Sequence, residues 1–122
     1  SKPLMDMTKR CAGAVAALIL MVAVAAASSS DDALDCFSAD NERRIVGCTA
    51  LIERGDTSTA EMSAIYGMRA LAYSLKGDYA TAIKDYDVAI QMQPNFAVAL
   101  NNRAWAYFRW GKAETGLPDV EK

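Results

Sequence analysis

Apolar residues recur at three- and four-residue intervals between Asn41 and Arg54, which is the spacing of one face of an amphipathic helix. Ser38 and Asp40 precede this segment, and either side chain can cap a helix N-terminus. Gly55 follows it and readily adopts the left-handed conformation of a helix C-cap. The pattern therefore predicts a first helix between these caps. Its apolar face consists of Ile45, Cys48, Leu51 and Ile52.

Three further segments have the same periodicity and predict helices over residues 60–76, 79–92 and 96–110. Glycine and proline, which end helices, stand between and after them. Because short connections join neighbouring helices in antiparallel pairs, the sequence predicts an all-α fold built of helical hairpins. The helix-ending residues are Gly77, Pro94 and Gly111.

Residues 66–79 match residues 100–113 with a shift of 34 positions, and five of the fourteen aligned positions are identical. In the first copy the identical residues are Arg69, Ala70, Ala72, Tyr73 and Gly77. A period of about 34 residues is typical of helix-turn-helix solenoids. The repeat predicts a stacked helical array, which presents a surface for another molecule rather than a reaction centre.

These positions resemble the tetratricopeptide repeat family. Tyr66 and Tyr73 stand where the first helix of the family has large aromatic residues, and Ala70 stands where it has a small one. Alanines at 70 and 82 allow the two helices of a unit to pack closely, with aromatic rings filling the gaps beside them. The resemblance implies antiparallel hairpins stacked as a short right-handed solenoid. The matching positions of the second helix and its end are Ala82, Tyr86, Ala89 and Pro94.

The resemblance also divides the predicted helical domain, residues 38–122. It implies an N-terminal capping helix over residues 38–55, a complete repeat over 63–96 and a partial repeat over 97–122. Pro118 departs from the family pattern and removes a backbone donor from the second helix of the partial repeat. Either the natural protein continues further, or the last helix is a degenerate cap.

An apolar run over residues 11–27 follows two basic residues and precedes a stretch rich in Ser and Asp. This order, with Ala25 and Ala27 at an A-x-A cleavage site, predicts a secretory signal peptide over residues 1–27. The run is near the lower length limit for crossing a bilayer, so an uncleaved inner-membrane anchor over residues 11–27 is the alternative. Residues 28–37 offer little to bury and are predicted to be a flexible leader.

Whether the protein is exported determines whether its cysteines are expected to form a disulfide. Loss of residues 1–27 removes Cys11 and leaves Cys36 and Cys48 as an even pair in an oxidising compartment, which predicts a disulfide between them. Closing this loop would contribute about 3 kcal/mol in the chain-entropy account. The alternative is two buried thiols. A metal site is not expected, because the chain has no His and structural zinc takes four ligands.

Charge and side-chain chemistry exclude several functions. The net charge is −2, the basic residues are scattered, and loss of residues 1–27 would remove three basic and one acidic residue to leave −4, so nucleic acid is not an expected partner. We expect no enzyme and no cofactor, since the chain lacks His, a Gly-rich phosphate loop and an activated Ser or Cys. Arg69 and Arg103, which recur in register, are interpreted as structural partners of acidic groups such as Asp85 or Asp87.

The resemblance implies that the first helices of successive repeats line a concave groove. An apolar groove with an amide and guanidinium edge suits an amphipathic helix or an extended peptide. Trp105 would be the anchor, with Asn102 and Arg109 bonding to the backbone or carboxylate of the ligand. The alternative is that a neighbouring helix covers Trp105 and Phe108. The predicted groove residues are Met68, Leu71, Leu75, Asn101, Asn102, Trp105, Phe108 and Arg109.

The function predicted from the sequence is that of a non-catalytic scaffold that binds a protein or peptide in the cell envelope, in the periplasm of a Gram-negative bacterium. The alternative is a structural or assembly module. Such a module would self-associate, or pack on a missing C-terminal domain, through its exposed last repeat. Contact with the membrane is expected only if residues 11–27 are retained.

Overall fold

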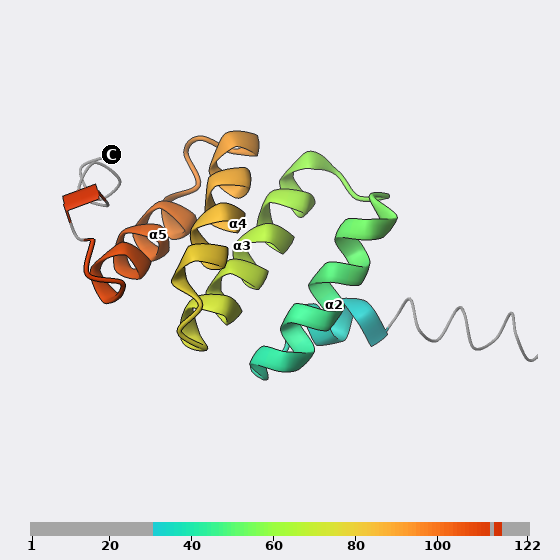
Figure 1. Ribbon diagram of the computed structural model, residues 1–122. Coiled ribbons are helices and arrows are strands. Elements are labelled where there is room, and N and C mark those ends of the chain that lie inside the picture. The colour runs from blue at the N-terminus through green and yellow to red at the C-terminus, as the bar shows by residue number, and fades with distance from the viewer. Residues whose placement is uncertain (1–30, 113, 116–122) are drawn as a thin grey trace, which may run out of the picture. The chain divides into compact units, whose positions relative to one another are not determined.

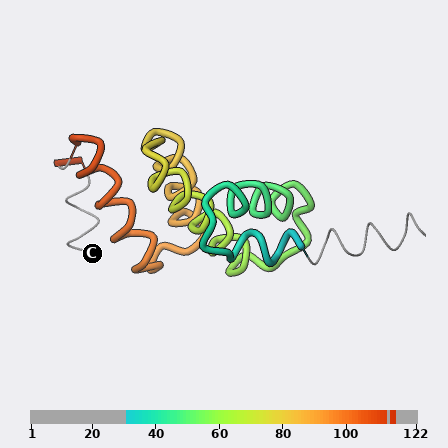
Figure 2. Tube along the Cα trace, turned by 90° about the horizontal axis from the view of Figure 1, so that it is seen from below, coloured from blue at the N-terminus to red at the C-terminus, as the bar shows by residue number. Residues whose placement is uncertain are grey.

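A short helical segment over residues 31–36 and four longer helices follow one another along the chain in the computed structural model, which describes residues 31–112, 114 and 115. From residue 32 onward the chain forms one unit, in which α2 packs on α3, α3 on α4, and α4 on α5. The chain reverses direction at each loop, so consecutive helices form antiparallel pairs (Figures 1 and 2). The described residues contain no β-strand. The helices are α2 (Asn41–Arg54), α3 (Thr59–Leu75), α4 (Tyr79–Met92) and α5 (Ala97–Arg109).

The helix bounds confirm the predictions from apolar periodicity. Helices α2 and α4 have the predicted limits, and α3 and α5 differ from the prediction by one residue at each end. At the start of α2, the side chain of Asp40 rather than that of Ser38 is the N-cap, because Asp40 Oδ1 accepts a hydrogen bond from Arg43 N at 2.9 Å. Gly55 ends the helix with a φ of 63°, as its lack of a side chain allows.

Helix α3 begins one residue earlier than predicted because of a capping box. Ser58 Oγ accepts from the backbone N–H of Glu61 at 3.2 Å, and the Glu61 carboxylate accepts from the backbone N–H of Ser58 at 3.0 Å. These two bonds satisfy N–H groups that a helix N-terminus would otherwise leave without partners. The cap fixes where the chain turns from the α2–α3 loop into the helix.

In the core between α3, α4 and α5, small residues surround the fully buried ring of Tyr86, and other aromatic rings pack against this cluster from its edge. The alanines allow the helix backbones to approach closely, and Tyr86, with no exposed surface, fills the remaining space. Ser63 adds a buried hydrogen bond, its hydroxyl donating to the carbonyl oxygen of Ala89 at 2.9 Å. Ala70 and Ala82, the small residues of the family pattern, are both fully buried in this core. The buried alanines of this core are Ala70, Ala82, Ala89, Ala99 and Ala106.

The predicted flexible leader over residues 28–37 is wrong for residues 31–37. Residues 31–36 are helical, and Cys36 is fully buried in a second core cluster with Cys48. The Cys36 and Cys48 sulfur atoms are bonded at 2.06 Å. Gly47 on α2 lies directly under this segment, so its missing side chain makes room for the backbone. A disulfide and a close backbone contact thus anchor this segment to α2.

Several predicted segments lie outside the described residues. These are the signal segment or membrane anchor, residues 28–30 of the leader, and residues 116–122 of the partial repeat. Residues 114 and 115 are helical. Within the described part of the chain, no helix combines the length and the apolar character needed to cross a membrane.

Candidate functional site

An apolar recess, which we call the α3–α5 pocket, opens between the first helices of the two repeats. It has a volume of about 110 Å³. Gly67 forms part of its wall, where a Cβ atom would be in van der Waals contact with Cε1 of Phe96 at 3.4 Å. Apart from the Tyr86 phenol, Asn102 carries the only polar side chain of the lining. The lining consists of Phe37, Ala64, Gly67, Met68, Leu71, Tyr86, Phe96, Val98, Ala99 and Asn102.

Three of the eight predicted groove residues line this pocket. Met68 and Leu71 come from α3, and Asn102 comes from α5. The other five do not line it and are exposed on α3 and α5. Among them, Trp105 lies under the guanidinium of Arg109, which is 5.9 Å from the ring centroid. The five exposed residues are Leu75, Asn101, Trp105, Phe108 and Arg109.

The other seven residues of the lining were not predicted from the sequence, and Phe37, Phe96 and Gly67 are the most informative of them. Phe37 lies in the segment predicted to be flexible, so no helical periodicity pointed to it. Phe96 is at the N-cap of α5, and Gly67 carries no side chain. A signal for Gly67 did exist, since a glycine in a helix interior weakens the helix and often marks a place where space is needed.

A second recess, which we call the N-terminal pocket, adjoins the first. Its volume is about 310 Å³. Phe37 and Ala64 line both pockets, so the two recesses meet at these residues. The N-terminal pocket lies between the helical segment before Phe37, α2, the α2–α3 loop and α3. Its lining consists of Ala33, Phe37, Leu51, Thr57, Glu61, Ala64 and Ile65.

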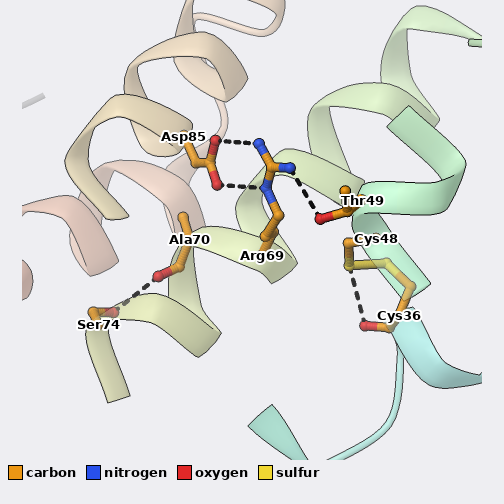
Figure 3. Close-up of polar contacts among 7 residues, drawn as sticks. All are labelled: Cys36, Cys48, Thr49, Arg69, Ala70, Ser74 and Asp85. Atoms are coloured by element: carbon orange, nitrogen blue, oxygen red, sulfur yellow. Dashed lines mark hydrogen bonds and ion pairs between the residues drawn. A yellow bond between two sulfur atoms is a disulfide. The ribbon is translucent and has the colours of Figure 1, made fainter. Parts of the chain in front are cut away.

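A network centred on Arg69 holds α3 against both of its neighbours, α2 and α4 (Figure 3). Its guanidinium donates to the Asp85 carboxylate of α4 through Nε and Nη2, each at 2.8 Å, and to Thr49 Oγ1 of α2 through Nη1 at 3.1 Å. The hydrogen bond with Asp85 is the main cause that raises the pKa of Arg69. Arg103 of α5 donates to Asp87 at 2.6 Å. The prediction that these arginines have structural acidic partners is confirmed.

Tyr86 supports the α3–α5 pocket from within the core. Its buried hydroxyl forms no hydrogen bond of regular geometry, although it interacts with the Ser74 hydroxyl, which donates to the carbonyls of Ala70 and Leu71. Burial raises the pKa of the Tyr86 phenol to about 12, and Ser74 and the charge of Arg44 offset only part of this rise. The phenol is therefore neutral at physiological pH and adds no charge to the apolar pocket.

The chemistry available at these pockets is that of recognition. The linings are mainly apolar, and their polar side chains are the Asn102 amide, the Glu61 carboxylate, the Thr57 hydroxyl and the Tyr86 phenol. No group of three or more His, Cys, Asp or Glu residues that could hold a metal ion occurs in the described part of the chain. An apolar side chain with a backbone polar group beside it is the ligand feature that such a surface accommodates.

Antiparallel helix pairs that stack through small residues, with a recess between the first helices of successive pairs, define a helical-repeat protein. Comparison with protein families gives two matches, both described as Tetratricopeptide repeat, over residues 63–96 and 86–117. Over residues 63–117 the chain belongs to the tetratricopeptide repeat family, whose repeats generally mediate contacts between proteins. The first match has the bounds of the complete repeat predicted from the sequence. Comparison with curated proteins and with solved structures gives no match.

Proposed function

We propose that the protein binds a short segment of another protein in the α3–α5 pocket and performs no chemistry on it. The observation that carries this proposal is an open apolar recess between the first helices of two repeats, with a single amide, that of Asn102, among its accessible side chains. Burying one apolar side chain of a ligand there would contribute about 1.5 to 3 kcal/mol. The amide would fix the ligand by bonding to its backbone.

The first prediction separates Asn102 from its neighbour Asn101. Both are on α5, but only Asn102 lines the pocket. A random peptide library displayed on phage, selected against the oxidised protein, is expected to yield a peptide with an apolar anchor. Fluorescence titration of that peptide should show that Asn102→Ala raises its Kd about tenfold, since it removes a hydrogen bond beside a buried anchor. Asn101→Ala is expected to leave the Kd unchanged.

Two results would contradict this assignment. One is a selection that enriches no peptide, and the other is a peptide whose Kd responds equally to both asparagine substitutions.

Light scattering on the same preparation tests the alternative that the protein self-associates. The large exposed side chains of α5 are the reason to consider this alternative. Trp105 is 40% exposed and Phe108 is 66% exposed. A particle mass that increases with protein concentration, and that returns to the mass of the monomer in Phe108→Ser, would favour that alternative.

We also propose that the protein works outside the cytosol, in the cell envelope. The bonded pair Cys36 and Cys48 supports this location, because disulfides persist in oxidising compartments. Intact mass spectrometry of protein recovered from the periplasmic fraction is expected to give the mass of residues 28–122 less two hydrogens. Recovery of an uncleaved chain with the membrane fraction would point to the anchored alternative. A reduced chain in the cytosol would contradict both.

A further inference from the structure

We infer that the ligand of this protein presents two apolar side chains, one for each pocket, with a basic residue beside the second. This inference depends on the proposed function, because it takes the α3–α5 pocket as the first binding position. It adds the N-terminal pocket as a second position, which belongs to a segment outside the matched repeats.

The first observation is the continuity of the two pockets. The side chains of Phe37 and Ala64 line both of them, so a chain that leaves one pocket reaches the next by crossing these two residues. Phe37 is 58% exposed, so its ring forms a divider at the surface instead of a covered core element. A divided groove accepts two separate side chains of an extended segment, whereas it would obstruct one continuous bulky group.

The second observation is how firmly the divider is held. Cys36, next to Phe37, is bonded to Cys48 of α2, and the buried guanidinium of Arg44 donates to the carbonyl oxygen of Ser38 through Nε at 3.0 Å and Nη2 at 2.7 Å. Both neighbours of Phe37 are thus fixed to α2. Because the backbone on either side of Phe37 is held to α2, the position of this residue sets the spacing of the two ligand side chains.

The third observation is the charge around the N-terminal pocket. Glu61 lines it, and its carboxylate is exposed. Glu61 is the one charged side chain in the lining of this pocket, whereas the α3–α5 pocket has no charged side chain in its lining. A Lys or Arg beside the second apolar side chain complements this charge.

The test uses fluorescein-labelled synthetic peptides and the oxidised protein. One set carries a single leucine, and the other carries two leucines joined by spacers of increasing length, with Lys beside the second. The second leucine is expected to lower the Kd about tenfold or more at one favoured spacing, because it buries a further apolar side chain. Exchange of the Lys for Glu is expected to raise that Kd about two- to fivefold, as for a single exposed ion pair.

Ala33→Phe is the decisive variant, because it places a ring in the N-terminal pocket from an exposed position. It should raise the Kd of the two-leucine peptide to that of the one-leucine peptide and leave the one-leucine peptide unaffected. Ala80→Phe is the matched control, since Ala80 is an exposed alanine of α4 that lines neither pocket, and it should change neither Kd.

The outcomes separate the two proposals. If the second leucine adds no affinity at any spacing, or if Ala33→Phe weakens both peptides equally, the second position is overturned. The proposed function then still stands, provided that Asn102→Ala weakens the one-leucine peptide. If neither peptide binds, both proposals are overturned.

Discussion

Replacing Asp85 with alanine is expected to lower the free energy of unfolding by about 3 to 5 kcal/mol, because it leaves a largely buried guanidinium without its carboxylate. The side chain of Asp85 is 8% exposed and that of Arg69 is 18% exposed. The variant keeps the single bond from Arg69 to Thr49, which places the expected loss toward the lower value. Urea unfolding of the oxidised protein, followed by circular dichroism, measures the change.

Asp87 provides the matched control on the same helix. It also pairs with an arginine of a neighbouring helix, Arg103, whose side chain is 16% exposed, but the Asp87 side chain itself is 54% exposed. Asp87→Ala is therefore expected to cost less than Asp85→Ala, because water already screens the carboxylate that is removed. The double variant Arg69→Met with Asp85→Leu should lose less than Asp85→Ala alone, since no buried charge remains unpaired. Equal losses from Asp85→Ala and Asp87→Ala would show that burial does not distinguish the two pairs.

Gly47→Ala is expected to destabilise the protein by about 2 kcal/mol, although alanine is the better helix former. An added Cβ atom would stand 2.5 Å from both the Asp32 carbonyl oxygen and the Cys36 backbone nitrogen. These are backbone atoms, so the whole helical segment before Phe37 must move away from α2. A gain of about 1 kcal/mol from helix propensity offsets only part of this cost. Urea unfolding gives the net change.

A second readout ties this loss to its location. Cys36 and Cys48 have no exposed surface, so dithiothreitol should reduce their disulfide slowly in the native chain and faster in Gly47→Ala. Gly67→Ala is the control: it is also helical, but its nearest contact would be 3.4 Å from Phe96, and its stability should be unchanged or slightly higher. Native stability and slow reduction in Gly47→Ala would mean that the segment does not lie on α2.

The helices and the family could be predicted because they depend on local and periodic features. Apolar spacing located α2 to α5, and alanines and tyrosines at fixed positions pointed to the repeat. The register of Arg69 and Arg103 was enough to suggest their acidic partners, because a helical hairpin brings such positions together. The apolar spacing, the positions of alanine and tyrosine and the register of the arginines can all be read from neighbouring segments of the sequence.

The pockets could not be predicted in the same way, because they depend on contacts with a segment that has no periodic pattern. Phe37 reaches the groove through the anchoring of its neighbours to α2, and nothing in its local sequence indicates this. Trp105 and Phe108 were predicted as groove residues because they are large residues on a first helix. The recess instead forms nearer the start of α5. There the small residue Gly67 on α3 leaves space opposite Phe96.

The three bonds of Arg69 also have a consequence for how the molecule responds to damage. In a helical array each unit touches only its neighbours, so a lesion at one end would normally stay local. One guanidinium here connects α2, α3 and α4, which makes the contact of α2 with α3 and that of α3 with α4 depend on the same side chain. Loosening of the contact between α2 and α3 therefore weakens the contact between α3 and α4. A substitution that destabilises the N-terminal end is expected to destabilise the first repeat as well.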